Sequence, residues 1–199
     1  DMAYSSYNFR VGTSTLNEIM QEEDSEKTVS EQEYWQDVWE EYVEDSSGYY
    51  SLMKVSDARV RMISETNYRK RGKMRSCEDV GVKVCVGDIC FIDFGMSYLN
   101  EAGFQHFGLI MKFCNNKAYV IPMSSNSYSY RRAYGKDNPN GRKHLMKLGR
   151  IYGMHKESVL FLNDARWINT ARIIDVKAHI DRRDVLFNEI KKRMLECLQ

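Results

Sequence analysis

His106 is a candidate for proton transfer near neutral pH, and it lies in the stretch NEAGFQHFGLIM, residues 100–111. Its imidazole follows a glycine turn and precedes an apolar run, which indicates the entrance of a β-strand. Glu101 and Gln105 lie on the same stretch, and Glu101 can accept a proton or orient the ring. The alternative is a histidine hydrogen-bonded to backbone at the strand entrance, beside a solvated loop carboxylate.

Hydroxyl groups end a second apolar stretch, KAYVIPMSSN, residues 117–126. Ser124 and Ser125 follow Pro122 at the predicted end of a strand, where a hydroxyl can donate to a phosphate oxygen. Asn126 can read the edge of a nucleic-acid base. Serine and asparagine also form turns, so a phosphate site and a plain turn both remain open.

Basic and aromatic residues alternate in YSYRRAYGKDNPNGRKH, residues 128–144. Single-stranded nucleic acid is bound by cationic grooves and by aromatic rings on which bases stack. The alternative is a solvated loop whose charges aid solubility. The surrounding residues 127–157 show no clear period and predict a long loop with room for short elements, and long loops in compact domains are often functional. The candidates for RNA binding are Tyr128, Tyr130, Arg131, Arg132, Arg142 and Lys143, together with Gln105, Ser125 and Asn126.

Hydrophobic periodicity predicts the elements that position these residues. Helical spacing of apolar residues predicts helices over residues 31–45 and 51–68, and a basic hinge, residues 67–75, at the end of the second helix. Residues 82–94 predict two strand segments, and Asn115 and Asn116 predict a two-residue hairpin turn. Further strands are expected over 158–164 and 170–176, and a final helix carries Asp184 near its start. Several short strands in so few residues favour a small barrel or a curled sheet.

Charge is distributed unevenly along the 199 residues, although the formal net charge is only +1. Residues 1–86 hold 11 Lys/Arg and 17 Asp/Glu, whereas residues 87–199 hold 18 and 11. The acidic front and basic back indicate two modules, residues 1–80 and 81–199, and the basic one suits a polyanion. The first predicted helix either packs its apolar stripe on the barrel as core, or uses its acidic face (part of residues 18–46) to shield the basic half. The stripe is Trp35, Val38, Trp39, Tyr42 and Val43.

The five cysteines form no CxxC pair, so we expect reduced, buried or half-buried thiols in a cytoplasmic protein. A zinc site would need better-spaced ligands than these, and we expect neither a metal nor a cofactor. Apolar runs fall well short of the ~20 residues of a membrane span, so no membrane partner is expected.

Four segments together resemble the PemK/MazF (Kid/CcdB-like) toxins of bacterial toxin–antitoxin systems. VGDICFIDFG is similar to the opening strand of that family, and NEAGFQHFGLIM is similar to its second motif. VIPMSSN and ESVLFLNDARWINTARI resemble its later strands, and the four segments occur in the family's order over roughly residues 82–199.

The resemblance implies an α+β, mainly β fold: a small SH3-like curled barrel with a C-terminal helix, here preceded by a helical N-terminal extension. It implies a homodimeric, metal-independent endoribonuclease that cleaves single-stranded RNA and is restrained by a cognate antitoxin protein. The family's catalytic threonine falls on Ser124, and its catalytic arginine falls on His106. A binding-only member of the same fold, taking RNA or a protein, is the alternative.

Overall fold

The computed structural model of the protein describes residues 28–31, 34–135 and 137–198, and the chain forms two compact units, residues 1–59 and 60–199. The first unit contains a short 3-10 helix, Val29–Glu31, and helix α2, Tyr34–Ser51. Helix α3, Val55–Arg71, crosses the division, which falls ahead of the domain boundary predicted after residue 80. That boundary stays a prediction.

Both N-terminal helices predicted from hydrophobic spacing are present, shifted by a few residues toward the C-terminus. On α2, the rings of Trp39 and Tyr42 stack with centroids 5.7 Å apart. The side chains of Trp35 and Val38 lie outside the described residues, and so does Glu33. Packing of this apolar stripe on the barrel therefore stays a prediction.

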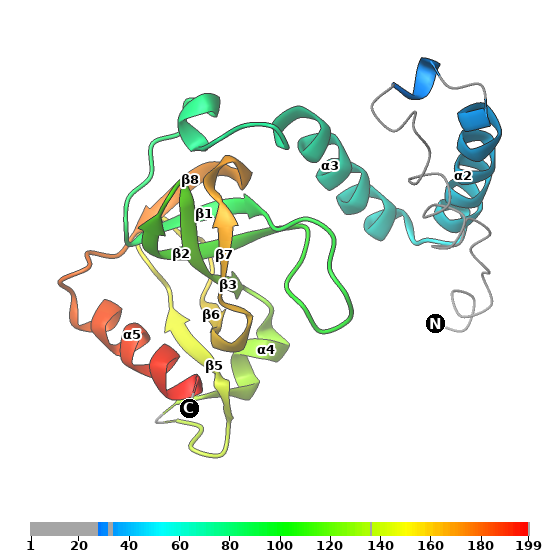
Figure 1. The fold of residues 1–199 in the computed structure, drawn as a ribbon. Helices are drawn as coiled ribbons and strands as arrows, with labels where there is room; N and C mark the ends of the chain where they lie inside the picture. The colour runs from blue at the N-terminus through cyan, green and yellow to red at the C-terminus, as the bar shows by residue number, and fades with distance from the viewer. Residues whose placement is uncertain (1–27, 32–33, 136, 199) are drawn as a thin grey trace. The chain divides into compact units, whose positions relative to one another are not determined.

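The second unit is built on one eight-stranded sheet that curls on itself (Figure 1). Its strand order is β4-β5-β6-β3-β2-β1-β8, with β7 paired to β3 beside β6. All pairs are antiparallel except β4 with β5. The strands are β1 Asp88–Asp93, β2 Gln105–Cys114, β3 Lys117–Ser124, β4 Ala133–Tyr134, β5 Arg142–Gly149, β6 Ser158–Phe161, β7 Arg166–Asn169 and β8 Ile173–His179.

Alternate residues of the central strands feed two separate hydrophobic clusters, as the two-residue period of a strand requires. Leu109 and Ile121 belong to one cluster, which also includes Phe187 and Ile190 of the last helix. Their sequence neighbours Ile110 and Val120 belong to the other, which Ile168 of β7 and Ile173 of β8 complete. Both faces of the central sheet are therefore buried, and the fold is the predicted mainly β curled barrel with a C-terminal helix.

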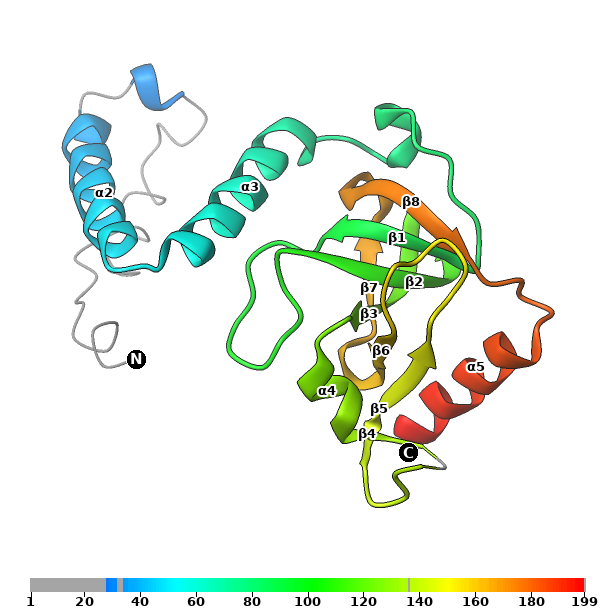
Figure 2. The same ribbon diagram turned by 180° about the vertical axis from the view of Figure 1, so that it is seen from behind.

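Turn chemistry fixes the register of the central hairpin. Asn115 and Asn116 both adopt positive φ, 46° and 62°, and join β2 to β3 as predicted. The last helix, α5, Val185–Cys197, begins where the Asp184 carboxylate accepts the Leu186 backbone N–H, 3.0 Å away. Figures 1 and 2 show α5 lying beside β5, and the helix buries Phe187 and Ile190.

Three sequence-based expectations are corrected by the structure. Only the second half of residues 82–94 forms a strand, because backbone pairing begins at Asp88. The predicted loop 127–157 contains helix α4, Ser127–Arg132, and the eight-residue strand β5. Strand β5 forms through its pairing with β6, although its sequence has no clear periodic pattern. The basic hinge begins inside α3, which continues to Arg71.

The five cysteines are all free, as predicted, but only Cys77 and Cys90 are buried. Burial raises the pKa of the Cys90 thiol to about 12, which keeps it protonated and inert. The expectation of buried thiols is wrong for Cys85, Cys114 and Cys197, which are exposed. Within the described residues, none of the helices is long and apolar enough to cross a membrane.

Helix α3 is attached to the barrel through the buried carboxylate of Asp93, the last residue of β1. Ser64 Oγ and Asn67 Nδ2 of α3 each donate to this carboxylate at 2.6 Å. The backbone N–H of Gly95 donates at 3.0 Å, and Gln105 Nε2 donates to it at 3.3 Å. The second half of α3 is therefore an integral part of the barrel unit.

Gly87 and Gly81 provide a matched test of the close approach between the start of β1 and the end of β8. Both have positive φ, 97° and 72°, but a Cβ on Gly87 would lie 2.1 Å from the Ile180 carbonyl oxygen, whereas Gly81 faces open space. We expect Gly81→Ala to cost about 1 kcal/mol in the free energy of unfolding, from backbone strain alone. Gly87→Ala should cost at least about 3 kcal/mol, because the strands must also separate. Equal losses in urea denaturation of the two variants would contradict this.

Candidate functional site

His106 and Ser124 lie at the ends of two neighbouring strands. His106 is the second residue of β2 and pairs with Ile92 of β1, and Ser124 is the last residue of β3. The last β2–β3 pair at this end of the sheet is Phe107 with Met123, and His106 and Ser124 are each one residue beyond it. Both predicted catalytic residues therefore lie at the same end of the β2–β3 pair, and a shared catalytic site stays a prediction.

The His106 ring is exposed and held in one tautomer. Its Nδ1 lies 2.5 Å from the backbone carbonyl oxygen of Gly103. Because a carbonyl only accepts, Nδ1 must carry the proton in this contact, and Nε2 is left with a lone pair when the ring is neutral. A histidine hydrogen-bonded to backbone was the alternative to a catalytic histidine in the sequence analysis, and this hydrogen bond is present. The same bond leaves Nε2 as the nitrogen that can accept a proton.

The connection between β1 and β2, which precedes His106, is held by one contact within it and by contacts from Asp164 and Arg166. Phe104, at φ 54°, donates its N–H to the Gly95 carbonyl oxygen at 2.6 Å. The Asp164 carboxylate accepts the Ala102 N–H at 2.7 Å, and the Arg166 guanidinium donates to the Ala102 carbonyl oxygen. Asp164 and Arg166 therefore position this segment. Their neighbouring residues in the sequence give no sign of this role.

Glu101 and Gln105 are used elsewhere in the structure. The Glu101 carboxylate accepts the Tyr98 N–H at 3.1 Å and closes its own turn. In the described part of the chain it makes no hydrogen bond to His106. The Gln105 amide lies on the opposite face of β2 from His106 and donates to Ser64 Oγ at 2.7 Å. Roles for Glu101 in catalysis and for Gln105 in RNA binding stay predictions.

Ser124 begins a polar turn that leads directly into α4. Its Oγ accepts the Asn126 N–H at 3.1 Å, and its own O–H remains able to donate. The Asn126 side chain accepts the Tyr128 N–H at 2.8 Å and caps α4. Ser125 is exposed in this turn. The turn role is thus observed, and it places Ser125, Asn126 and Tyr128 next to Ser124 in the chain.

Helix α4 carries the part of the predicted RNA-binding set that is most accessible. Tyr128 is exposed, and the Arg132 guanidinium lies over its ring, 4.8 Å from the centroid. Arg131 is also exposed. Tyr130 differs, because it packs against the small cluster around Val159 and its hydroxyl donates to Glu157 at 3.4 Å. Burial, and then the nearby Glu157 carboxylate, raise the pKa of the Tyr130 hydroxyl.

The remaining basic candidates, Arg142 and Lys143, are exposed at the start of β5. Strand β6 separates β5 from β3, which puts about 10 Å between those two strands. Lys147 of β5 is closer to Ser124, because both residues pair with Val159. Lys147 was not among the residues predicted from the sequence. Its ammonium group forms an ion pair with Asp137, and its Nζ lies 5.3 Å from the centroid of the Tyr130 ring. Arg142 and Lys143 are therefore exposed, as two of the candidates on α4 are, but they lie two strands away from the end of β3 that carries Ser124.

Comparison with known proteins finds solved structures that match the chain. No protein-family model and no curated protein sequence matches the chain. The chain is similar to the crystal structure of MazF (Form-I) from Deinococcus radiodurans. The alignment covers 59% of this chain and 97% of that chain, at 12% sequence identity and a TM-score of 0.43.

The tautomer of His106 can be measured directly. At a pH where the ring is neutral, we expect long-range proton–nitrogen NMR spectra to show the proton on Nδ1 and the lone pair on Nε2, because the Gly103 carbonyl oxygen accepts from Nδ1. His155 is the internal control, since it is exposed and the described residues give it no hydrogen-bonding partner. A neutral His106 protonated on Nε2 would show that this contact is not maintained in solution.

Proposed function

We propose that residues 60–199 form a metal-independent endoribonuclease that cleaves single-stranded RNA, the toxin component of a type II toxin–antitoxin system. The observation that carries the proposal is the exposed His106 ring, whose Nδ1 donates to the Gly103 carbonyl oxygen and leaves the Nε2 lone pair for proton transfer. Ser124 lies at the same end of the β2–β3 pair, one residue beyond its last pair, Phe107 with Met123. The four sequence segments that resemble the PemK/MazF toxins lie on β1, β2, β3 and the β6–β8 region.

In this reaction His106 Nε2 removes the proton from a ribose 2′-hydroxyl, and the 2′-oxygen attacks the adjacent phosphorus. The bond to the 5′-oxygen breaks, leaving a 2′,3′-cyclic phosphate on one fragment and a 5′-hydroxyl on the other. The proton that the 5′-oxygen needs comes from solvent or from protonated His106 after the attack. The Ser124 hydroxyl donates to a non-bridging phosphate oxygen and stabilises its growing negative charge.

The RNA path of the proposal follows the turn from Ser124 into α4. The Tyr128 ring offers a stacking surface, and Arg131 and Arg132 offer positive charge beside it. The whole unit supports binding of a polyanion, because residues 60–199 hold 25 Lys/Arg and 14 Asp/Glu, a net of +11. Arg142 and Lys143 would contact RNA further from the cleaved bond.

Cleavage can be tested with purified protein and a long unstructured RNA in EDTA. We expect 5′-hydroxyl ends and cyclic phosphates, and His106→Ala should lower the cleavage rate about 10²–10⁴-fold because proton transfer is lost. Ser124→Ala should lower it about 10²-fold through loss of one phosphate donor. His155→Ala, an exposed histidine outside the site, should leave the rate unchanged. Intact RNA with the wild-type protein, over many sequence contexts, would falsify the enzymatic proposal.

A binding-only role is the second candidate, and one observation favours it. Glu101 closes its own turn, so among the described residues His106 is the one proton-transfer group identified at this place. In-line displacement puts the attacking and departing oxygens on opposite sides of phosphorus, and one imidazole reaches one side at a time. Salt-dependent RNA binding without cleavage would establish this candidate instead.

Partners and location form part of the proposal. A homodimer in a bacterial cytoplasm, restrained by a cognate antitoxin protein, is the arrangement that the sequence resemblance implies. The acidic first unit suggests an internal counterpart to such an antitoxin, because residues 1–59 hold 4 Lys/Arg and 14 Asp/Glu, a net of −10. A tethered acidic segment competes with RNA for a basic surface.

Truncation tests this competition, and the structure sets where the cut must fall. Residues 1–54 can be removed with α3 intact, whereas a cut beyond Ser64 would remove a partner of buried Asp93. We expect the truncated protein to bind single-stranded RNA at least tenfold more tightly at low salt, with the difference shrinking as salt rises. Equal RNA affinities for both lengths would rule out shielding by the acidic unit.

A further inference from the structure

Three potential metal ligands from distant parts of the sequence converge where β1 begins and β8 ends. They are Cys85 in the segment before β1, Asp88 at the start of β1, and His179 at the end of β8. Their ligand atoms all lie within 4.8 Å of one another. The strand register accounts for this, because Asp88 pairs with His179 and the Ile180 N–H donates to the Gly87 carbonyl oxygen at 2.9 Å.

The three side chains aim at one point rather than forming a relay. Asp88 Oδ1 lies 2.8 Å from His179 Nδ1 and 3.3 Å from Cys85 Sγ, and Sγ lies 3.8 Å from the same Nδ1. A nucleophilic relay would place thiol and carboxylate on opposite nitrogens of the imidazole. Here the thiol and the carboxylate both contact Nδ1 of His179. This nitrogen carries at most one proton, so it cannot hydrogen-bond as a donor to one group and accept a proton from the other.

We propose that Cys85 Sγ, Asp88 Oδ1 and His179 Nδ1 form a Zn²⁺ site. Zinc bonds of about 2.3 Å to sulfur and about 2.0–2.2 Å to nitrogen and oxygen, at tetrahedral angles, separate the ligand atoms by roughly 3.3–3.6 Å. The three distances above bracket that range, so adjustments of about half an ångström bring the ligands onto one ion. The mixed sulfur, nitrogen and oxygen set suits zinc, and a thiolate with a carboxylate balances its charge.

The site is built into rigid backbone, as a metal site requires. The second oxygen of Asp88 accepts the Cys85 N–H at 2.7 Å, which fixes the carboxylate, and Asp88 itself is buried. The Asp88 N–H donates to the Cys85 carbonyl oxygen at 3.2 Å and closes the turn between the two ligands. Cys85 and His179 are exposed, so an ion can reach the site from solvent.

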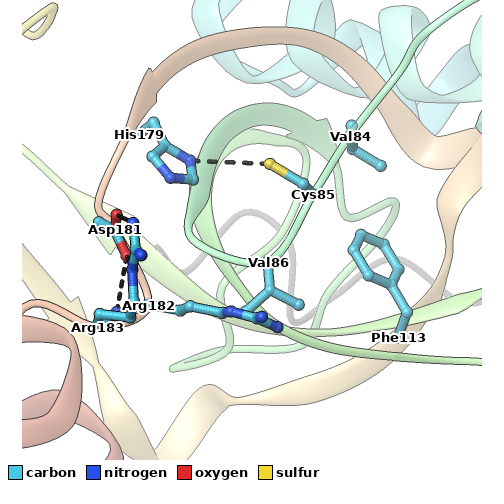
Figure 3. A pocket seen from close by; sticks show the side chains of 8 residues that line it. All are labelled: Val84, Cys85, Val86, Phe113, His179, Asp181, Arg182 and Arg183. Atoms are coloured by element: carbon cyan, nitrogen blue, oxygen red, sulfur yellow. Dashed lines mark hydrogen bonds and ion pairs between the residues drawn. The ribbon is translucent and has the colours of Figure 1, made fainter.

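A pocket of about 510 Å³ borders two of the three ligands (Figure 3). Cys85 and His179 form part of its wall, together with Val84, Phe113 and Arg182. Three protein ligands leave a tetrahedral ion with a fourth position, and the pocket supplies room there for water. Arg183, also at the pocket, is already paired with Asp181 at 2.8 Å.

This site is separate from the proposed cleavage site. Asp88 and Ile92, the partner of His106, are four residues apart on β1, which corresponds to roughly 13 Å. The inference therefore does not rest on RNA cleavage, and cleavage in EDTA would leave it standing.

Zinc binding to the full-length protein tests the inference. We expect one Zn²⁺ per chain in competition with a chromophoric chelator, and a rise in melting temperature when Zn²⁺ is added. Co²⁺ in place of Zn²⁺ should give the visible bands of a tetrahedral ion and a sulfur-to-cobalt charge-transfer band. Cys85→Ser should remove the charge-transfer band, and His179→Gln should weaken zinc binding at least tenfold.

Matched variants separate this site from adventitious binding by other thiols and imidazoles. Cys114→Ser and His155→Gln alter an exposed cysteine and an exposed histidine away from the site, and should leave zinc affinity unchanged. Melting temperatures of all variants in EDTA should match the wild type, which shows that they fold. Failure of the wild type to bind Zn²⁺, or equal effects of the site and control variants, would overturn the inference.

Discussion

The need to satisfy the buried carboxylate of Asp93 organises the part of the barrel on which the candidate site depends. A carboxylate 5% exposed is costly unless donors surround it. Ser64, Asn67 and Gln105 supply side-chain donors, and Gly95 supplies a backbone N–H. These donors come from a helix, a strand and the connection between strands. One charge therefore ties α3, β1 and the start of β2 together.

This tie also decides which way the start of β2 faces. Gln105 points toward α3 to reach Ser64 and Asp93, and the strand period then turns His106 to the other, exposed face. The Gly103 carbonyl oxygen, held in the same connection, selects the His106 tautomer. The chemistry available to an exposed histidine thus follows from a buried aspartate one strand away.

The sequence predicted those features that local chemistry determines. Apolar runs predicted β2 and β3, two asparagines predicted their turn, and Asp184 marked the start of α5. The resemblance of the motifs implied one site for His106 and Ser124; both residues lie at the same end of the β2–β3 pair, and the site itself stays a prediction. Long-range contacts left no local signal. Strand β5 exists because β6 pairs with it, and Asp164 and Arg166 reach Ala102 from more than 60 residues away.

The two ends of β1 show how the same residue type takes different roles through its donors. Asp93 and Asp88 are both buried, 5% and 6% exposed. The side-chain donors of Asp93 are a hydroxyl and amides, which do not lose protons near neutral pH, so its network is complete as it stands. The side-chain partners of Asp88 are a thiol and an imidazole, which can give up protons and bind a metal. A spacing rule for cysteines could not reveal this, because His179 lies 91 residues from Asp88 and joins it only through the β1–β8 register. The sheet that creates the proposed cleavage site at one end of β1 therefore creates the proposed metal site at the other.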